Sequence, residues 1–221
     1  AAGMFRRAFE TPDAASLLEH LRGGARVAVA SGLVGPSRAL TVAVTHYALK
    51  RPVLVIVPDL AGLEAIRRDV SFFVDVLGGE GASDRDVLAL PDSEADPYDG
   101  MSPHAEILEE RANALLHLAR GTVPIVISTV RGLLRRTVSP ERLIDQAVEI
   151  ALETDYRLEV IVDTLLSAGY VREDPVGAVG EFSLRGGILD VFPPGRDTGV
   201  RVEFFGDTAD SIRAFDPETQ R

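Results

Sequence analysis

One segment of the chain has the position and some of the residue types of a phosphate-binding loop. The eight residues from Gly32 to Ala39 follow an apolar run and precede a helical pattern. Phosphate loops of the form G-x-x-x-x-G-K-[ST] use glycines for close backbone approach, a lysine for charge and a hydroxyl that holds magnesium. Here Ser37, Arg38 and Ala39 stand at the second glycine, the lysine and the hydroxyl. The segment is therefore a degenerate nucleotide loop.

Two interpretations of this segment stay open. In the first it is an ordinary turn between a strand and a helix, in which Gly32 and Gly35 adopt positive φ and Pro36 takes the first helical position. In the second, Arg38 and the neighbouring amides still hold a phosphate, although Pro36 removes one amide donor from the loop. The chain would then be part of an ATPase whose acidic residues come from elsewhere.

No other group of residues points to catalysis or to a metal. The four histidines form no pair at metal-ligand spacing, and the absence of cysteine excludes disulfides, thiol nucleophiles and cysteine-bound zinc. Carboxylates gather between residues 92 and 99, but prolines interrupt them and calcium-loop spacing is absent. We therefore expect no catalytic residue, no metal site and no cofactor in this chain.

Composition narrows the remaining function classes. A formal net charge of −11 argues against a surface that binds nucleic acid broadly, because such binding depends on clustered Lys and Arg. No apolar run is long enough to span a membrane, and no signal-peptide pattern opens the chain. With 46% apolar residues and no cysteine, the composition predicts a soluble, cytoplasmic protein with a substantial core.

Residues 1–146 show alternating strand and helix patterns. A helix with apolar residues at helical spacing is expected after the capping Asp59. Four short β-branched runs read as buried parallel strands: Arg26–Ser31, Val53–Val57, Val87–Leu90 and Ile125–Ser128. These patterns predict an α/β domain with a parallel sheet, similar in plan to a phosphate-loop domain that has degenerated.

Residues 147–221 change to a different pattern. A helix is expected near residues 157–168, followed by short strands separated by Gly, Pro and Asp turns. The strands are Phe182–Leu184, Ile188–Phe192, Val200–Phe204 and Ser211–Phe215. This predicts a small α+β domain with an antiparallel sheet. Arg201, Glu203 and Phe205 alternate along one strand and therefore share a face.

Several strings, in a shared order, resemble the N-terminal module of bacterial transcription-repair coupling factors, which is built like the excision-repair protein UvrB. The resemblance runs from about Val27 to Arg221. Its strings are Asp96–Asp99, Ser102–His104, Ser167–Tyr170, Gly180–Phe182, Leu184–Pro193 and Arg201–Asp207.

The resemblance implies a UvrB-like scaffold that has lost two UvrB activities. UvrB has an intact phosphate loop and a long aromatic hairpin that clamps damaged DNA, whereas this chain has neither feature and contains no Asp-Glu dipeptide. The family implies a translocase motor outside this chain, which uses ATP and magnesium. Other domains of the longer protein would engage RNA polymerase and DNA. The alternative is a UvrB-like or helicase-like ATPase that still binds nucleotide at residues 32–39.

The resemblance also implies a partner. In the family the small second domain recruits the damage-recognition ATPase UvrA through arginines and an aromatic residue, which correspond here to Arg185, Arg201 and Phe205. Glu203 lies on the same expected face. Arginine and aromatic side chains are the types that dominate protein interfaces. From the pattern alone, an ordinary exposed sheet face, with Phe205 folded over the core edge, is the competing interpretation.

Overall fold

The computed structural model of the chain describes residues 10–92, 105–122, 125–194, 196 and 198–220. It divides into two compact units, Ala1–Thr137 and Val138–Arg221. The sequence analysis placed this division after residue 146. Residues 138–146, between the observed and the predicted boundary, include the short helix α8 (Pro140–Asp145), whose first turn is capped by the Ser139 hydroxyl. This helix belongs to the second unit.

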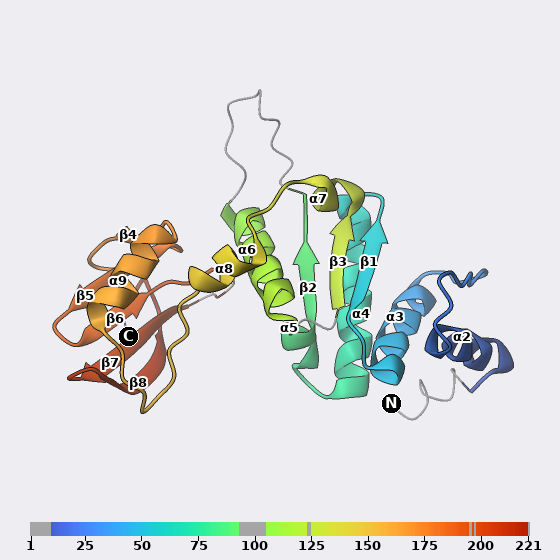
Figure 1. The fold of residues 1–221 in the computed structure, drawn as a ribbon, viewed down its shortest axis with the longest axis horizontal. Coiled ribbons are helices and arrows are strands. Elements are labelled where there is room, and N and C mark those ends of the chain that lie inside the picture. Colours follow the sequence, from blue (N-terminus) through green and yellow to red (C-terminus); the bar gives the residue numbers. More distant parts are fainter. Residues whose placement is uncertain (1–9, 93–104, 123–124, 195, 197, 221) are drawn as a thin grey trace, which may run out of the picture. The chain divides into compact units, whose positions relative to one another are not determined.

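The first unit is built on a parallel sheet of three strands in the order β1-β3-β2 (Figure 1). These strands are β1 (Val53–Val57), β2 (Val87–Leu90) and β3 (Ile125–Thr129). Val53 and Val87 both lie opposite Ile125, on either side of the central strand. Three of the predicted parallel strands are thereby confirmed, and the unit is α/β.

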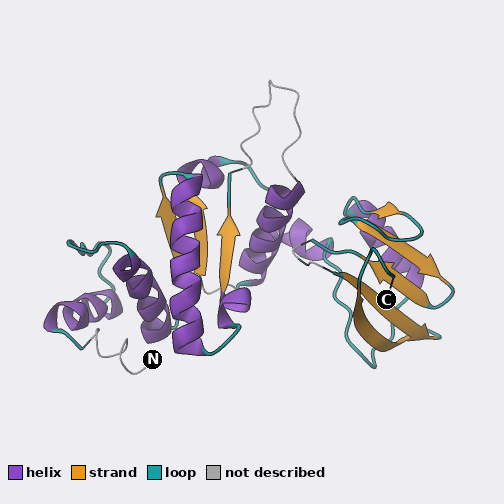
Figure 2. Cartoon of the chain, turned by 180° about the vertical axis from the view of Figure 1, so that it is seen from behind, coloured by secondary structure: helices purple, strands orange, loops and turns teal. Residues whose placement is uncertain are grey.

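The core of the first unit lies between this sheet and two helices, α3 (Pro36–Leu49) and α4 (Leu60–Gly78). The predicted cap of α4 is present, since Asp59 Oδ1 accepts a hydrogen bond of 2.7 Å from the Gly62 amide. Figure 2 shows α4 lying across one face of the sheet. Leu63 and Val70 on α4 are fully buried against the sheet. On the other face, α6 (Ala105–Arg120) packs against β2.

Residues 26–31 do not form the fourth strand that the sequence predicted. They have no regular secondary structure and pair with none of the described strands, and Val27 and Val29 are exposed. The segment lies beside α2 (Pro12–Arg22) and α3, with which it lines a cavity. β-branched residues favour a strand only where a pleated neighbour is available to pack against. Without such a neighbour the apolar run remains irregular.

A buried arginine ties together the ends of β2 and β3. The Arg111 guanidinium, on α6, donates to the carbonyl oxygens of Pro91 and, at 3.3 Å, Gly132. The Ser128 hydroxyl adds a 2.6 Å hydrogen bond to the Leu90 carbonyl. Burial lowers the pKa of Arg111 from its ordinary value. The strings at 96–99 and 102–104, which the resemblance marked, lie outside the described residues.

The second unit contains a separate five-stranded sheet in the order β4-β5-β6-β7-β8. Its strands are β4 (Val171–Arg172), β5 (Glu181–Arg185), β6 (Ile188–Val191), β7 (Gly199–Phe205) and β8 (Thr208–Phe215). The pairs from β5 to β8 are antiparallel, as predicted, but β4 runs parallel to β5. The sheet is therefore mixed. The loop at 173–180 returns the chain so that β5 begins beside the start of β4. The sequence analysis did not predict β4, because a strand of two residues leaves no periodic signal.

The helix that the sequence analysis expected near residues 157–168 is α9 (Leu158–Ser167), and it covers one face of this sheet. Ile161 and Leu165 pack there against buried strand residues that include Phe182, Leu189 and Val202. Among the described helices of both units, none has the combination of length and apolarity needed to cross a membrane.

Candidate functional site

The degenerate nucleotide loop has the geometry of a turn that leads into a helix, but the segment before it is not a strand. Gly32 and Gly35 have φ values of 78° and 49°, and Pro36 is the first residue of α3. The Ser37 hydroxyl donates a 2.8 Å hydrogen bond to the Val34 carbonyl and accepts one of 2.9 Å from the Val34 amide. The Ser37 amide also donates to the Val34 carbonyl, at 3.2 Å. These donors are used within the loop instead of pointing toward a common centre.

In this chain Arg38 and Ala39 stand at the two positions that in a phosphate loop carry the lysine and the magnesium-binding hydroxyl. The Arg38 Nε donates a 3.2 Å hydrogen bond to the Leu33 carbonyl, so this side chain folds back on its own loop. Ala39 is fully buried in the core of the first unit. A hydroxyl at residue 39 would consequently face apolar side chains. The loop provides neither of the two groups that bind a magnesium nucleotide.

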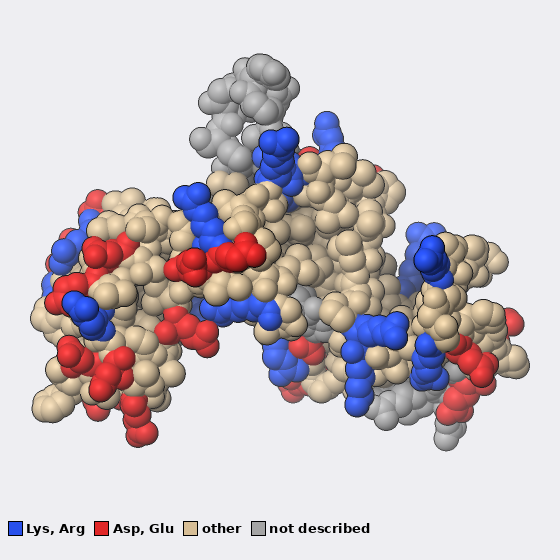
Figure 3. All heavy atoms as spheres, viewed as in Figure 1, with Lys and Arg blue, Asp and Glu red and all other residues tan. Residues whose placement is uncertain are grey.

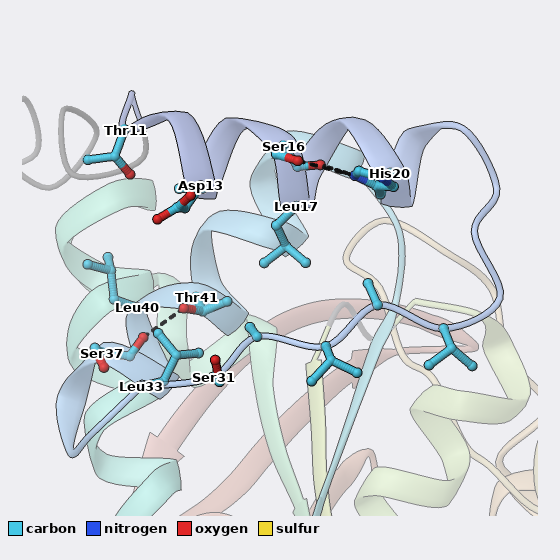
Figure 4. Close-up of a pocket in the computed structure, with 15 residues that line it drawn as sticks. Thr11, Asp13, Ser16, Leu17, His20, Ser31, Leu33, Ser37, Leu40 and Thr41 are labelled. Atoms are coloured by element: carbon cyan, nitrogen blue, oxygen red, sulfur yellow. Dashed lines mark hydrogen bonds between the residues drawn. The ribbon is translucent and has the colours of Figure 1, made fainter.

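A cavity of about 760 Å³ lies next to the loop, between α2, residues 27–31 and α3 (Figure 4). Of the five loop residues that the sequence singled out, only Ser37 lines it. Its described lining residues include Asp13 but neither Lys nor Arg. His20 and Thr41, two of its polar residues, hydrogen-bond locally to the carbonyls of Ser16 and Ser37. A phosphate would therefore meet a carboxylate here without a compensating cation.

The second unit presents a polar sheet face opposite α9, which we call the arginine face. Strand register places two rows of side chains on it. One row runs from Arg185 on β5 through Ile188 on β6 to Glu203 on β7, and the next contains Asp190 beside Arg201. The arginine face is defined by Arg185, Ile188, Asp190, Arg201, Glu203, Phe205 and Arg213. Thus the four residues predicted as a partner site do share one face.

Arg201 is engaged within this face. Its guanidinium donates two hydrogen bonds to the Asp190 carboxylate, Nε to Oδ1 at 2.6 Å and Nη2 to Oδ2 at 2.7 Å. It also stacks on Phe215, with Cζ 5.1 Å from the ring centroid. The Arg201 side chain is only 18% exposed, and the hydrogen bonds to Asp190 raise its pKa above the ordinary arginine value. Most of its binding capacity is already used.

Arg185 and Phe205 are the accessible members of the predicted set. Arg185 has a side chain that is 59% exposed, with Nη1 at 3.3 Å from Asp174 Oδ1 and Nη2 at 3.9 Å from Asp190 Oδ2. Phe205 is 84% exposed, so it does not fold back over the core edge. Glu203 accepts hydrogen bonds from Arg213 and Ser211. The predicted set thus offers one exposed cation and one aromatic ring for contact with another protein, and Arg213, outside that set, is a second exposed cation paired with Glu203.

Three residues of the arginine face were missed by sequence reasoning: Ile188, Asp190 and Arg213. Asp190 left a detectable signal, because an acid within the apolar run Ile188–Phe192 requires a charged partner if the strand is buried. Ile188 and Arg213 left none, since their position opposite the predicted residues depends on strand register. Figure 3 shows acidic and basic side chains interspersed over the second unit, which agrees with these pairings.

Comparisons with known proteins place this surface in a family context. Residues 148–221 match the family described as the UvrB interaction domain. Transcription-repair-coupling factors are similar over most of the chain. The one from Myxococcus xanthus is 41% identical over 210 residues, covering 94% of this chain and 17% of the relative. Those of Escherichia coli K12 and Bacillus subtilis 168 are 32% and 28% identical, over 77% and 96% of this chain. The chain spans 14% and 17% of those two relatives.

Proposed function

The chain belongs to the transcription-repair-coupling factor family, and from this premise we propose that its second unit is an adaptor surface that recruits UvrA. In this role it links an RNA polymerase stalled on the template to nucleotide excision repair. The chain itself performs no chemistry in the process. Its contribution is a protein contact made through the arginine face.

The observation that carries this proposal is the exposure of Arg185 and Phe205 on one face of the UvrB interaction domain. An arginine and an aromatic ring are the side chains most often found at the centre of protein interfaces. The exposed Arg185 guanidinium lies 3.3 Å from the accessible Asp174 and 3.9 Å from the buried Asp190, so a partner carboxylate can approach it at small cost. Phe205 has apolar surface that burial in a partner would remove from water.

Arg201 and Glu203 have supporting roles in the proposed interface. Arg201 is held by Asp190 and Phe215, and Glu203 by Arg213 and Ser211. Both residues position the surrounding face and contribute less direct contact. This division of roles differs from the equal weighting that the family resemblance suggested.

We further propose that the first unit is a phosphate-loop-like scaffold without ATPase activity. Support comes from the self-bonded Ser37 hydroxyl, the folded-back Arg38 and the buried Ala39. These observations count against the alternative of a UvrB-like or helicase-like ATPase acting at residues 32–39. ATP, magnesium, DNA and RNA polymerase would be bound by parts of the longer relatives that this chain does not span, in the cytoplasm.

The test is a calorimetric titration of this chain with purified UvrA. Arg185→Ala and Phe205→Ala are each expected to weaken binding by about 2 kcal/mol, or roughly thirtyfold. Arg157→Ala serves as the control, because this exposed arginine precedes α9, which covers the other face of the sheet. Thermal melting of every variant separates lost contact from lost folding.

The proposed partner, UvrA, and the proposed binding surface, the arginine face, can be contradicted separately. If the wild-type chain does not bind UvrA at micromolar concentrations, the adaptor function is wrong. If it binds but neither Arg185→Ala nor Phe205→Ala differs from Arg157→Ala, the partner is right and the face is wrong.

A further inference from the structure

Ile188 lies on the arginine face, and the sequence analysis did not single it out as a site residue. It is 39% exposed and lies in strand register between Arg185 on β5 and Glu203 on β7. Directly opposed residues on neighbouring strands have Cβ atoms about 5 Å apart, so these three side chains adjoin one another. Phe205 lies two residues beyond Glu203 on the same side of β7.

The other end of the arginine face is closed by its own side chains. Phe215, Phe192 and Val176 form a buried cluster there, and the Arg201 guanidinium lies over the Phe215 ring. Apolar surface at that end is therefore already covered from within the unit. At the opposite end Ile188 and Phe205 keep their apolar surface in water, and the accessible Arg185 is beside them. The face is consequently asymmetric. Its apolar surface is covered at the end near Phe215 and exposed at the end near Phe205, which we call the open end.

We propose that Ile188 and Phe205 together form the apolar centre of the partner contact and that Arg185 is its charged edge. This inference rests on the proposed function, because it takes the arginine face to be the surface that binds UvrA. The matching surface on the partner is an apolar patch with a carboxylate at its border, placed to meet Arg185. The ion pair of Asp190 with Arg201 forms the rigid support behind this centre.

The chemistry of the open end determines this assignment. A contact centre needs apolar surface that becomes fully dry, surrounded by groups that keep water out. Ile188 adds a rigid β-branched side chain beside the exposed Phe205 ring, and Glu203 already accepts hydrogen bonds from Arg213 and Ser211. Arg213, which is 57% exposed, compensates the charge of Glu203 on that side of Ile188, whereas a partner acid directed at Arg185 would be attracted. The orientation of the partner follows from this difference.

The same sheet offers a matched control for Ile188. Ile212 on β8 is 38% exposed, so the two isoleucines lose similar surface when shortened. Ile212 lies opposite Val202, whose side chain belongs to the core beneath α9, and therefore points to the other face. Ile188→Ala and Ile212→Ala thus compare the two faces at equal chemistry. Ile188→Thr, which keeps the branched shape, provides a milder variant should the alanine variant fold poorly.

The experiment is a titration of purified UvrA with the wild-type chain, Ile188→Ala, Ile188→Thr, Ile212→Ala and Arg185→Ala, with each melting temperature measured. We expect Ile188→Ala to weaken binding at least about tenfold and Ile188→Thr less, while Ile212→Ala changes it less than about threefold. Binding losses for Ile188→Ala that equal those for Ile212→Ala would overturn the inference. If Arg185→Ala still weakens binding roughly thirtyfold in that case, the proposed function holds without this inference. A wild-type chain that does not bind UvrA overturns both.

Discussion

Asp190 and Arg201 face each other across β6 and β7 and form two parallel hydrogen bonds in which the carboxylate is 2% exposed. This relationship gives Arg201 a different role from Arg185, although both arginines belong to the motifs that the family resemblance marked. Arg201 is part of the support of the sheet face, and Arg185 projects from it. The Asp190 pair therefore determines which side chains remain available to a partner.

Replacing Asp190 should destabilise the second unit strongly. Asp190→Ala leaves the Arg201 guanidinium partly buried and without its acceptor, which we expect to cost about 3 kcal/mol of the free energy of unfolding. Glu203→Ala is the control, since its ion pair with Arg213 is more exposed and should contribute less than about 1 kcal/mol. Urea unfolding followed by circular dichroism measures both. Equal losses in the two variants would show that Asp190 is not the buried support of this face.

The turn between β5 and β6 should couple stability to binding. A Cβ added at Gly187 would stand 2.6 Å from the Phe204 carbonyl oxygen, so Gly187→Ala must displace the strand end that carries Phe205. We expect a loss of about 1 to 3 kcal/mol in stability together with weaker UvrA binding. Gly177→Ala is the control, because its Cβ would meet only Glu181 Oε2, at 3.9 Å. Thermal melting and calorimetry measure the two effects, and unchanged binding in Gly187→Ala would contradict the prediction.

Ionic strength should distinguish the charged edge from the apolar centre of the contact. Binding of the wild-type chain to UvrA is expected to weaken as salt is raised, because solvent-accessible charges are screened over about 10 Å at 0.1 M salt. Arg185→Ala should reduce this salt dependence. Ile188→Ala should lower the affinity at every salt concentration and leave the salt dependence unchanged. Dissociation constants measured at several salt concentrations provide the comparison. A salt dependence that Arg185→Ala leaves intact would assign the charged contact to another residue.

The degenerate loop should not respond to nucleotide, and restoring its hydroxyl should harm the fold. Ala39→Thr forces a larger polar side chain into the core, with an expected cost of about 1 to 3 kcal/mol. Ala48→Thr, at a half-buried position of the same helix, controls for the lower helix propensity of threonine. Thermal melting with and without Mg-ATP completes the test, since a ligand at a hundred times its dissociation constant adds about 2.7 kcal/mol. A clear rise in the wild-type melting temperature would restore the ATPase alternative.

The sequence alone determined the elements whose local signals are strong. Val53–Val57 and Ile125–Thr129 stand out as short runs rich in β-branched residues, and the central strand Ile125–Thr129 is buried on both faces, whereas Leu54 and Ile56 on β1 are about half exposed. Asp59 marks the start of α4, and Gly186 and Gly206, with φ values of 58° and 65°, mark the hairpin turns. Alternation along β7 also placed Arg201, Glu203 and Phe205 on one face, since strand side chains repeat every two residues.

Which of these segments pair with a neighbour depends on the three-dimensional fold. The run at 26–31 has strand composition, but it lies beside α2 and α3 and pairs with no described strand. Periodicity within one strand also says nothing about the register between strands, which brought Asp190 to Arg201 and Ile188 beside Arg185. A side chain's exposure depends on such contacts between distant parts of the chain. For this reason residue type suggested the partner-binding arginines, while the fold separated the supporting one from the accessible one.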